Sequence, residues 1–193
     1  VAAPAFLGHT TPQAFPEKMA VLAALYGFEP ASLQTARVLE IGCGTGVNTI
    51  ALAETYKDAN IVGIDSLPAN IENAEKHQKA LGLKNVIFHS CPYDKMESDL
   101  GTFDYIVIND TYARQDNDTQ QSILSFVKKH LAPKGFACIS YSTMPGWQMQ
   151  KSFTDMLHIH AQNAQTPEEK IQRTLQFIEL MHETLDKKNP LYD

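Results

Sequence analysis

The stretch VLEIGCGTGVNTIALA, residues 38–53, constrains the fold of this chain more than any other segment. Its first residues are mostly apolar, as in a buried strand, and from Val47 onward apolar side chains recur at helical spacing. Between them stand Gly42, Gly44 and Gly46, which lack a Cβ and allow the backbone to turn tightly against a ligand. The stretch therefore predicts a strand, a nucleotide-binding turn and a helix in direct succession.

The spacing of the glycines indicates which nucleotide the turn accepts. A dinucleotide fingerprint is G-x-G-x-x-G, and its third glycine would fall on Val47, whereas this chain reads G-x-G-x-G. Glu40 lies two residues before the first glycine, where a carboxylate would repel a pyrophosphate and attract a cation. The turn thus disfavours a nicotinamide-dependent dehydrogenase and suits a positively charged, phosphate-free nucleoside such as S-adenosylmethionine (SAM).

A second landmark, IVGID at residues 61–65, predicts another strand that ends in a carboxylate. Asp65 follows Gly46 by nineteen residues, a distance at which the next parallel strand presents an acid to ribose hydroxyls. Glu40, the three glycines and Asp65 resemble the first two motifs of the class I (Rossmann-like) SAM-dependent methyltransferases. The resemblance implies SAM as the cofactor and S-adenosylhomocysteine as its product. The predicted cofactor contacts are Glu40, Gly42, Cys43, Gly44, Gly46, Asn48, Asp65, Ser66, Cys91, Pro92 and Asn109.

Strand and helix patterns alternate along most of the chain. Further strands are predicted over residues 86–88, 103–110 and 136–141, with a turn at residues 133–135 before the last of them. Helices are predicted from Pro16 to Gly27, from Pro68 to Gly82, and from Ile123 to Leu131. This alternation predicts a doubly wound, mainly parallel sheet with helices on both faces.

The pattern changes after Tyr141. A Pro-Gly loop is followed by one helix, and a capping box at Thr166 and Glu169 announces another. The closing hairpin that normally ends the resembled fold is missing, so either helices replace it or it lies beyond Asp193, and we expect a fragment. The predicted units are an arm and cover helix (1–30), a SAM-binding core (31–145) and a helical extension (146–193) that leads to a further domain.

The fourth strand ends where open parallel sheets bind their ligands, which makes its last residues candidates for the reacting centre. The predicted catalytic residues are Asn109, Asp110, Tyr112 and Tyr141. They do not form the Asn-Pro-Pro-Tyr pattern that methylates adenine. After the third strand, Pro92 replaces the acid with which many of these enzymes bind adenine, so the base is expected to meet a backbone group near Cys91 or the side chain of Asp94.

A narrower resemblance joins the lead-in TPQAFPEKMAVLAALYGFEP, the glycine stretch and the loop SYSTMPGWQ. They are similar to a bacterial subgroup in which a methyltransferase regulatory domain follows the methyltransferase domain, and some members methylate lysines of outer-membrane proteins. The resemblance covers roughly residues 10–160 and implies transfer to a nucleophilic acceptor, with a protein lysine as the first candidate. Two alternatives stay open: a small-molecule acceptor, and a non-catalytic SAM-binding regulatory module.

Net charge, cysteine usage and the length of apolar runs limit the kinds of partner that this chain is expected to have. The net charge of −6 argues against a nucleic-acid backbone as the main partner, because such proteins usually carry a basic face. The cysteines are odd in number and lack metal-ligand spacing, which predicts no disulfide framework, no metal and a reduced compartment. No apolar run approaches membrane length, so no membrane partner and a cytoplasmic location are predicted. The sequence does not predict the oligomeric state.

Overall fold

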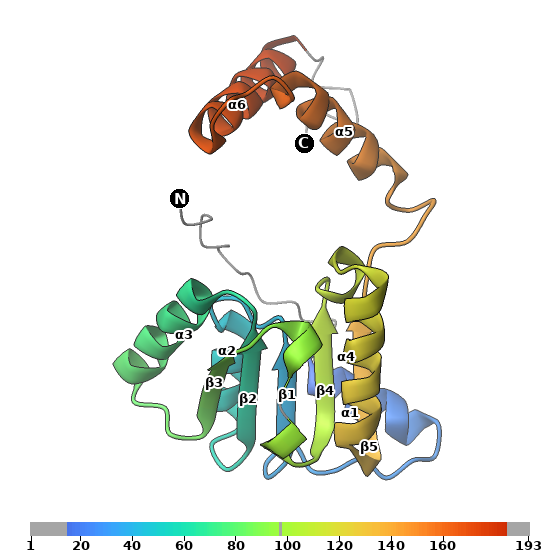
Figure 1. Cartoon of the computed structure of the whole chain (residues 1–193). Coiled ribbons are helices and arrows are strands. Elements are labelled where there is room, and N and C mark those ends of the chain that lie inside the picture. Colours follow the sequence, from blue (N-terminus) through green and yellow to red (C-terminus); the bar gives the residue numbers. More distant parts are fainter. Residues whose placement is uncertain (1–14, 97, 185–193) are drawn as a thin grey trace. The chain divides into compact units, whose positions relative to one another are not determined.

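The computed structural model describes residues 15–96 and 98–184, so most of the predicted N-terminal arm lies outside the described residues. The chain divides into two compact units, Val1–Tyr141 and Ser142–Asp193, and each is described by itself. The first unit contains all the strands of the described residues and the glycine turn (Figure 1).

A parallel five-stranded sheet forms the centre of the first unit, in the order β3-β2-β1-β4-β5. Its strands are β1 (Arg37–Ile41), β2 (Asn60–Asp65), β3 (Val86–Ser90), β4 (Phe103–Asn109) and β5 (Leu131–Ser140). Its helices are α1 (Pro16–Leu25), α2 (Val47–Thr55), α3 (Pro68–Leu81) and α4 (Asn117–His130), with 3-10 turns η2 (Tyr93–Lys95), η3 (Ser98–Leu100) and η4 (Tyr112–Arg114). The predicted doubly wound parallel sheet is therefore confirmed.

The strand order reverses direction at β1, which pairs with β2 on one side and β4 on the other. Ile41, the last residue of β1, stands opposite Ile64 of β2 and Ile108 of β4. The carboxyl ends of the three strands therefore lie side by side. The helices that follow β1 and β2 pack on one face of the sheet, and the helix that follows β4 packs on the other. Open α/β sheets bind ligands at such a switch point.

Two hydrophobic layers cover the sheet, one on each face. Helices α1, α2 and α3 bury apolar side chains such as Met19, Leu52 and Ile71 on one face, and α4 buries Ile123 and Phe126 on the other. Figure 1 shows α4 and α2 on opposite sides of the strands. Because both faces are covered, the central strands read as nearly continuous apolar runs.

Two predicted boundaries were wrong near the ends of β4 and β5. β4 stops at Asn109 rather than Asp110, because Asp110 adopts a left-handed backbone with φ of 52° and turns the chain away. The predicted turn at residues 133–135 lies inside β5, which begins at Leu131. The ladder is irregular there, since Leu131 pairs with Phe103 and the next pair joins Phe136 to Tyr105. The extra residues form a bulge, which accommodates a proline without a backbone donor.

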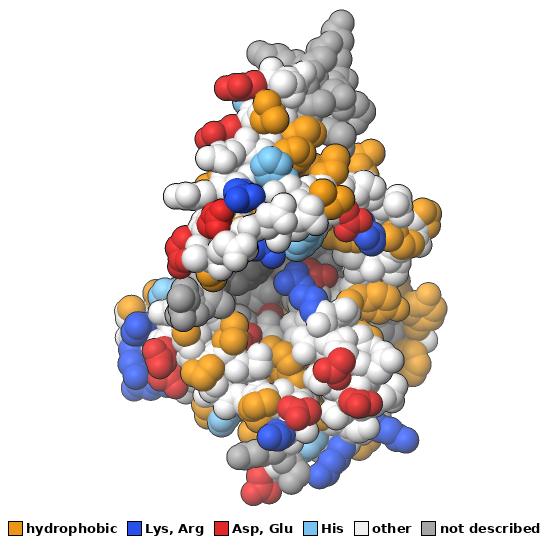
Figure 2. Space-filling model, turned by 45° about the horizontal axis from the view of Figure 1, so that its top comes forward, with side chains coloured by type: hydrophobic (Ala, Val, Ile, Leu, Met, Phe, Trp, Pro, Cys, Tyr) orange, Lys and Arg blue, Asp and Glu red, His pale blue; other side chains and the backbone are white. Residues whose placement is uncertain are grey.

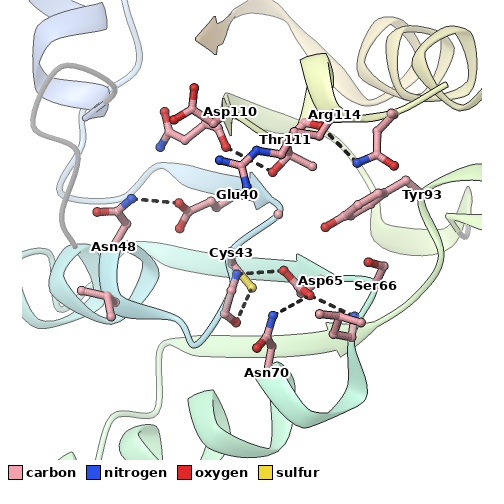
Figure 3. Close-up of a pocket in the computed structure, with 16 residues that line it drawn as sticks. Glu40, Cys43, Asn48, Asp65, Ser66, Asn70, Tyr93, Asp110, Thr111 and Arg114 are labelled. Atoms are coloured by element: carbon pink, nitrogen blue, oxygen red, sulfur yellow. Dashed lines mark hydrogen bonds between the residues drawn. The ribbon is translucent and has the colours of Figure 1, made fainter. Parts of the chain in front are cut away.

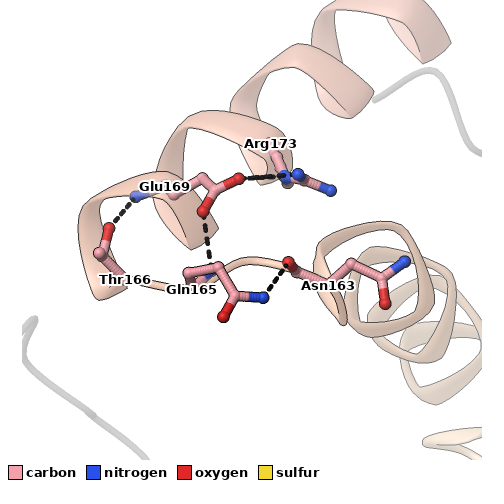
Figure 4. Close-up of polar contacts among 5 residues, drawn as sticks. All are labelled: Asn163, Gln165, Thr166, Glu169 and Arg173. Carbon is pink, nitrogen blue, oxygen red and sulfur yellow. Dashed lines mark hydrogen bonds and ion pairs between the residues drawn. The ribbon is translucent and has the colours of Figure 1, made fainter.

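The second unit is a pair of helices, α5 (Gln148–Ala161) and α6 (Pro167–Thr184), that pack on each other. The predicted capping box begins α6: Thr166 Oγ1 accepts from the amide of Glu169, whose carboxylate accepts from the amide of Gln165 (Figure 4). Hydrophobic side chains, orange in Figure 2, remain on its surface. Ile159 and Leu175 are more than half exposed. None of the helices described is long and apolar enough to cross a lipid bilayer.

Candidate functional site

A cavity of about 320 Å³ opens at the switch point, beyond the carboxyl ends of β1, β2 and β4 (Figure 3). This volume is at the lower end of the usual range for small-molecule sites, about 300 to 1,000 Å³. The lining consists of Glu40, Gly42, Cys43, Gly44, Val47, Asn48, Asp65, Ser66, Leu67, Asn70, Tyr93, Asn109, Asp110, Thr111, Arg114 and Gln115. The glycine turn and the residues that follow β2 and β4 supply nearly all of it.

The glycine turn forms the floor of the cavity. Gly44 has open space where a Cβ would stand, and its amide donates to Asp65 Oδ2 at 2.9 Å. Gly42 faces Thr111 so closely that a Cβ would overlap the threonine hydroxyl. Gly46 is absent from the lining, because it faces the core, where a Cβ would meet Phe88. Only part of the glycine motif therefore faces ligand space.

The carboxylate of Asp65 is buried and joins three segments of the chain. Its Oδ1 accepts from the amide of Leu67 at 2.9 Å and from Nδ2 of Asn70 at 3.1 Å, while Oδ2 accepts from Gly44. These bonds connect the glycine turn to the turn between β2 and α3. Asp65 thus fixes the shape of the cavity as well as contributing negative charge to it.

Glu40 is the second buried acid, with 3% of its surface exposed. Its carboxylate accepts from Oγ1 of Thr49 at 2.5 Å and from Nδ2 of Asn48 at 3.1 Å. Burial raises the pKa of Glu40 above its ordinary value of 4.5, and the hydrogen bonds from Thr49, Asn48 and Asn109 act in the opposite direction. The donors around Glu40 are neutral, so its charge is not cancelled by a partner cation among them.

The residues after β4 form the opposite wall. Asn109 Oδ1 accepts from the hydroxyl of Ser140 at 3.0 Å, which ties the end of β4 to the end of β5. Asp110 is exposed and lines the cavity from its left-handed backbone position. The predicted catalytic pair Asn109 and Asp110 therefore comes together at the cavity.

Other predicted site residues lie outside the lining of this cavity. Cys91 and Pro92 line a separate cavity of about 330 Å³ beside the end of β3. Tyr112 and Tyr141 contact each other, with ring centroids 6.4 Å apart, and neither is part of the lining. Their predicted roles toward adenine and in catalysis stay predictions.

The charges of the lining match the ligand chosen from the glycine spacing. Among the described residues of the lining, Glu40, Asp65 and Asp110 are acidic and only Arg114 is basic, so a pyrophosphate would meet mainly like charge. Gly44 leaves room for a ligand to approach the backbone. These residues fit a cationic nucleoside better than a dinucleotide.

A family model described as a methyltransferase domain matches residues 33–188. The chain belongs to the methyltransferase family. The predicted class, the class I SAM-dependent methyltransferases, is confirmed, and SAM is the cofactor of that class. The fold and the chemistry of the cavity agree with this assignment.

Two proteins that this chain resembles are longer than the chain itself. The sequence is 33% identical to the uncharacterized protein RP028 of Rickettsia prowazekii (strain Madrid E), covering 92% of this chain and 71% of that protein. The structure of PKMT2 from Rickettsia typhi in complex with AdoHcy matches with a TM-score of 0.80 and 31% identity, over 95% of this chain and 35% of PKMT2. The domain thus spans about a third of the length of PKMT2.

Several residues of the methyltransferase cavity were not predicted. Asn70 lies five residues after Asp65 in the first turn of α3, and only the structure shows that it is buried and donates to the carboxylate of Asp65. Tyr93 follows Pro92 directly, and burial together with the charge of Asp65 raises the pKa of its phenol to about 12. Arg114 is part of η4, and nothing in its sequence neighbourhood separates it from a surface arginine. The further unpredicted members are Val47, Leu67, Thr111 and Gln115.

Proposed function

We propose that this chain is the cofactor-binding and catalytic domain of a protein-lysine N-methyltransferase. The observation that carries the proposal is its 31% identity to PKMT2 over 95% of this chain, since that name denotes a protein-lysine methyltransferase. Asp110 supports it, because an exposed acid at the cavity would attract a cationic acceptor such as a lysine ammonium.

The cofactor supplies a methyl group on a sulfonium centre, which a nucleophile accepts with little covalent help. The residues of this chain therefore act by binding and positioning. Glu40 belongs to the lining but is almost completely buried. Its negative charge attracts the methionine ammonium, which it contacts directly or through a water molecule. Gly44 allows the cofactor to approach the backbone of the turn closely.

Asp65 has room for only part of the predicted ribose contact. A carboxylate offers about four lone-pair positions, and three protein donors already use three of those on Asp65. One ribose hydroxyl takes the remaining position. The second hydroxyl is held by Ser66 or Asn70, which lie beside Asp65 in the lining. Tyr93 and Leu67 then bound the end of the cavity that receives the adenine.

An acceptor lysine must lose its proton before its nitrogen can attack, because its ordinary pKa is about 10.4. Asp110 orients the acceptor by its charge, and the proton leaves to water at the open side of the cavity. Asn109 is held by Ser140 and fixes the position at which Asp110 leaves the strand. With the cofactor bound, the nitrogen lone pair would form the new bond to the methyl carbon, and the electron pair of the carbon–sulfur bond would stay on the sulfur.

The test combines binding with transfer. The purified chain is titrated calorimetrically with S-adenosylhomocysteine, and tritiated methyl transfer is followed into a protein mixture and into the same mixture with its lysines acetylated. We expect micromolar binding and label in methyl-lysine of the unblocked mixture only. Asp110→Asn should slow transfer about tenfold or more and spare binding. Asp58→Asn, an exposed acid in the turn before β2, is the matched control.

The contradicting outcomes are distinct. Binding with label only in small molecules refutes the lysine acceptor. Binding without any transfer favours the regulatory module, and absence of binding refutes the cofactor assignment for this chain.

A further inference from the structure

Among the described residues that line the cavity, Arg114 is the one basic side chain beside three acids. It belongs to η4, just beyond the end of β4, and its side chain is exposed. Figure 3 shows its guanidinium reaching back over the cavity toward the space between Asp110 and Glu40. The guanidinium thus brings a positive charge to one end of an otherwise acidic cavity.

The chain has three arginines, and the other two have partners in the protein. Arg37 donates to two backbone carbonyls, and Arg173 pairs with Glu169 at 2.7 Å. Within residues 15–96 and 98–184, the guanidinium of Arg114 donates no hydrogen bond and forms no ion pair. Its donors are therefore available to a ligand in the cavity.

We propose that Arg114 binds the carboxylate at the methionine end of SAM and of S-adenosylhomocysteine. This rests on the proposed function, because it takes the cofactor of that function as the ligand. A guanidinium presents two parallel N–H donors that match a carboxylate, and it stays charged at any working pH. The ammonium and the carboxylate of an α-amino acid share one carbon atom. A buried acid, Glu40, and a guanidinium at the same end of the cavity match both groups.

The competing donors are the backbone amides of the first turn of α2, near Val47, where the helix dipole also favours an anion. If those amides bind the carboxylate alone, removal of the guanidinium will change affinity very little. The two arrangements therefore predict different results for one substitution.

Decarboxylated SAM is the decisive probe, because it keeps the adenosine, the sulfonium and the ammonium and lacks only the carboxylate. The affinities of SAM and decarboxylated SAM are measured by calorimetry for the wild-type chain, Arg114→Gln and Arg114→Lys. Lys134→Gln is the matched control, since it changes the net charge equally at an exposed position outside the cavity. Circular dichroism verifies that each variant is folded.

We expect Arg114→Gln to weaken SAM binding about tenfold to a hundredfold, the range for a hydrogen bond between charged groups. The affinity for decarboxylated SAM should not fall, because the substitution removes a like charge beside its ammonium. Arg114→Lys should lie between, because a lysine keeps the charge but not the paired donors. The wild-type preference for SAM should shrink as salt is raised, since Arg114 is exposed.

Two results would overturn the assignment: unchanged SAM affinity in Arg114→Gln, or equal losses for SAM and decarboxylated SAM. If the unchanged affinity is accompanied by a higher KM for the acceptor, Arg114 belongs to acceptor binding instead. Failure of the wild-type chain to bind SAM at all would instead refute the proposed function, so the two failures are distinguishable.

Discussion

Replacing Thr49 with valine removes the 2.5 Å hydrogen bond to the buried carboxylate of Glu40, and we expect the loss of stability to grow with pH. Thr49 is fully buried and Glu40 is 3% exposed, so water cannot replace the lost donor. A hydrogen bond to a charged group contributes about 2 kcal/mol. That amount is the expected fall in the free energy of unfolding when Glu40 is ionised.

The sign of the pH dependence follows from the direction of the pKa. Burial raises the pKa of Glu40, so from its ordinary value of 4.5 upward the folded chain holds a proton that the unfolded chain has lost. In that window, the stability contributed by Glu40 falls as pH rises. Thr49→Val removes the largest of the opposing hydrogen bonds and raises the pKa further. The variant should therefore lie close to wild type near pH 4.5 and fall about 2 kcal/mol below it toward pH 8.

Urea unfolding followed by circular dichroism at pH 5, 6, 7 and 8 measures this difference. Thr55→Val is the control, because Thr55 lies exposed on the same helix and donates only to the carbonyl of Ala51. In a Glu40→Gln background the pH dependence of Thr49→Val should vanish, since no charge remains to be stabilised. A pH-independent difference, or an equal effect of Thr55→Val, would refute the reasoning.

Two further predictions concern the glycine turn and its neighbours. Gly42→Ala should lower the free energy of unfolding by about 3 kcal/mol, because its Cβ would overlap Thr111 and its φ of 81° disfavours any side chain; urea unfolding measures this, and a wild-type midpoint would contradict it. Cys43 should resist iodoacetamide at pH 8 until urea unfolds the chain, since burial and then the charges of Glu40 and Asp65 raise the pKa of its thiol well above 9.0. Peptide mass spectrometry compares it with half-buried Cys91, which should react first.

The fold was predictable because its determinants are local and periodic. Short stretches of sequence are enough to predict the main features. They are the glycine turn after residues 38–41, the carboxylate that ends residues 61–65, and the ends of α3 at Pro68 and Gly82. The strand order follows from right-handed crossovers between consecutive parallel strands. The two boundaries that were wrong have different causes. The bulge in β5 is set by its pairing with β4, which is distant in the sequence. The end of β4 is set by Asp110, which takes a backbone conformation that few non-glycine residues adopt.

The site was predictable to the extent that it follows strand ends. Glu40, Asp65 and Asn109 each stand at or near the carboxyl end of a parallel strand, and the topology brings such positions together. Tyr93 and Arg114 come from 3-10 turns, whose side-chain directions have no sequence period. Cys91 and Pro92, which were placed by strand alignment, line a separate cavity, and their contact with the cofactor stays a prediction.

The three glycines show why a motif predicts a site better than it predicts a contact. All three have positive φ, but the reason for the missing side chain differs among them. A Cβ at Gly42 would overlap Thr111, and one at Gly46 would meet the ring of Phe88. At Gly44 the space is open and is left to the ligand. The turn is therefore held by the core and by the loop after β4 as well as by its own backbone. The amide of Gly44 is already held by Asp65, so a ligand that contacts Gly44 meets a preorganised turn.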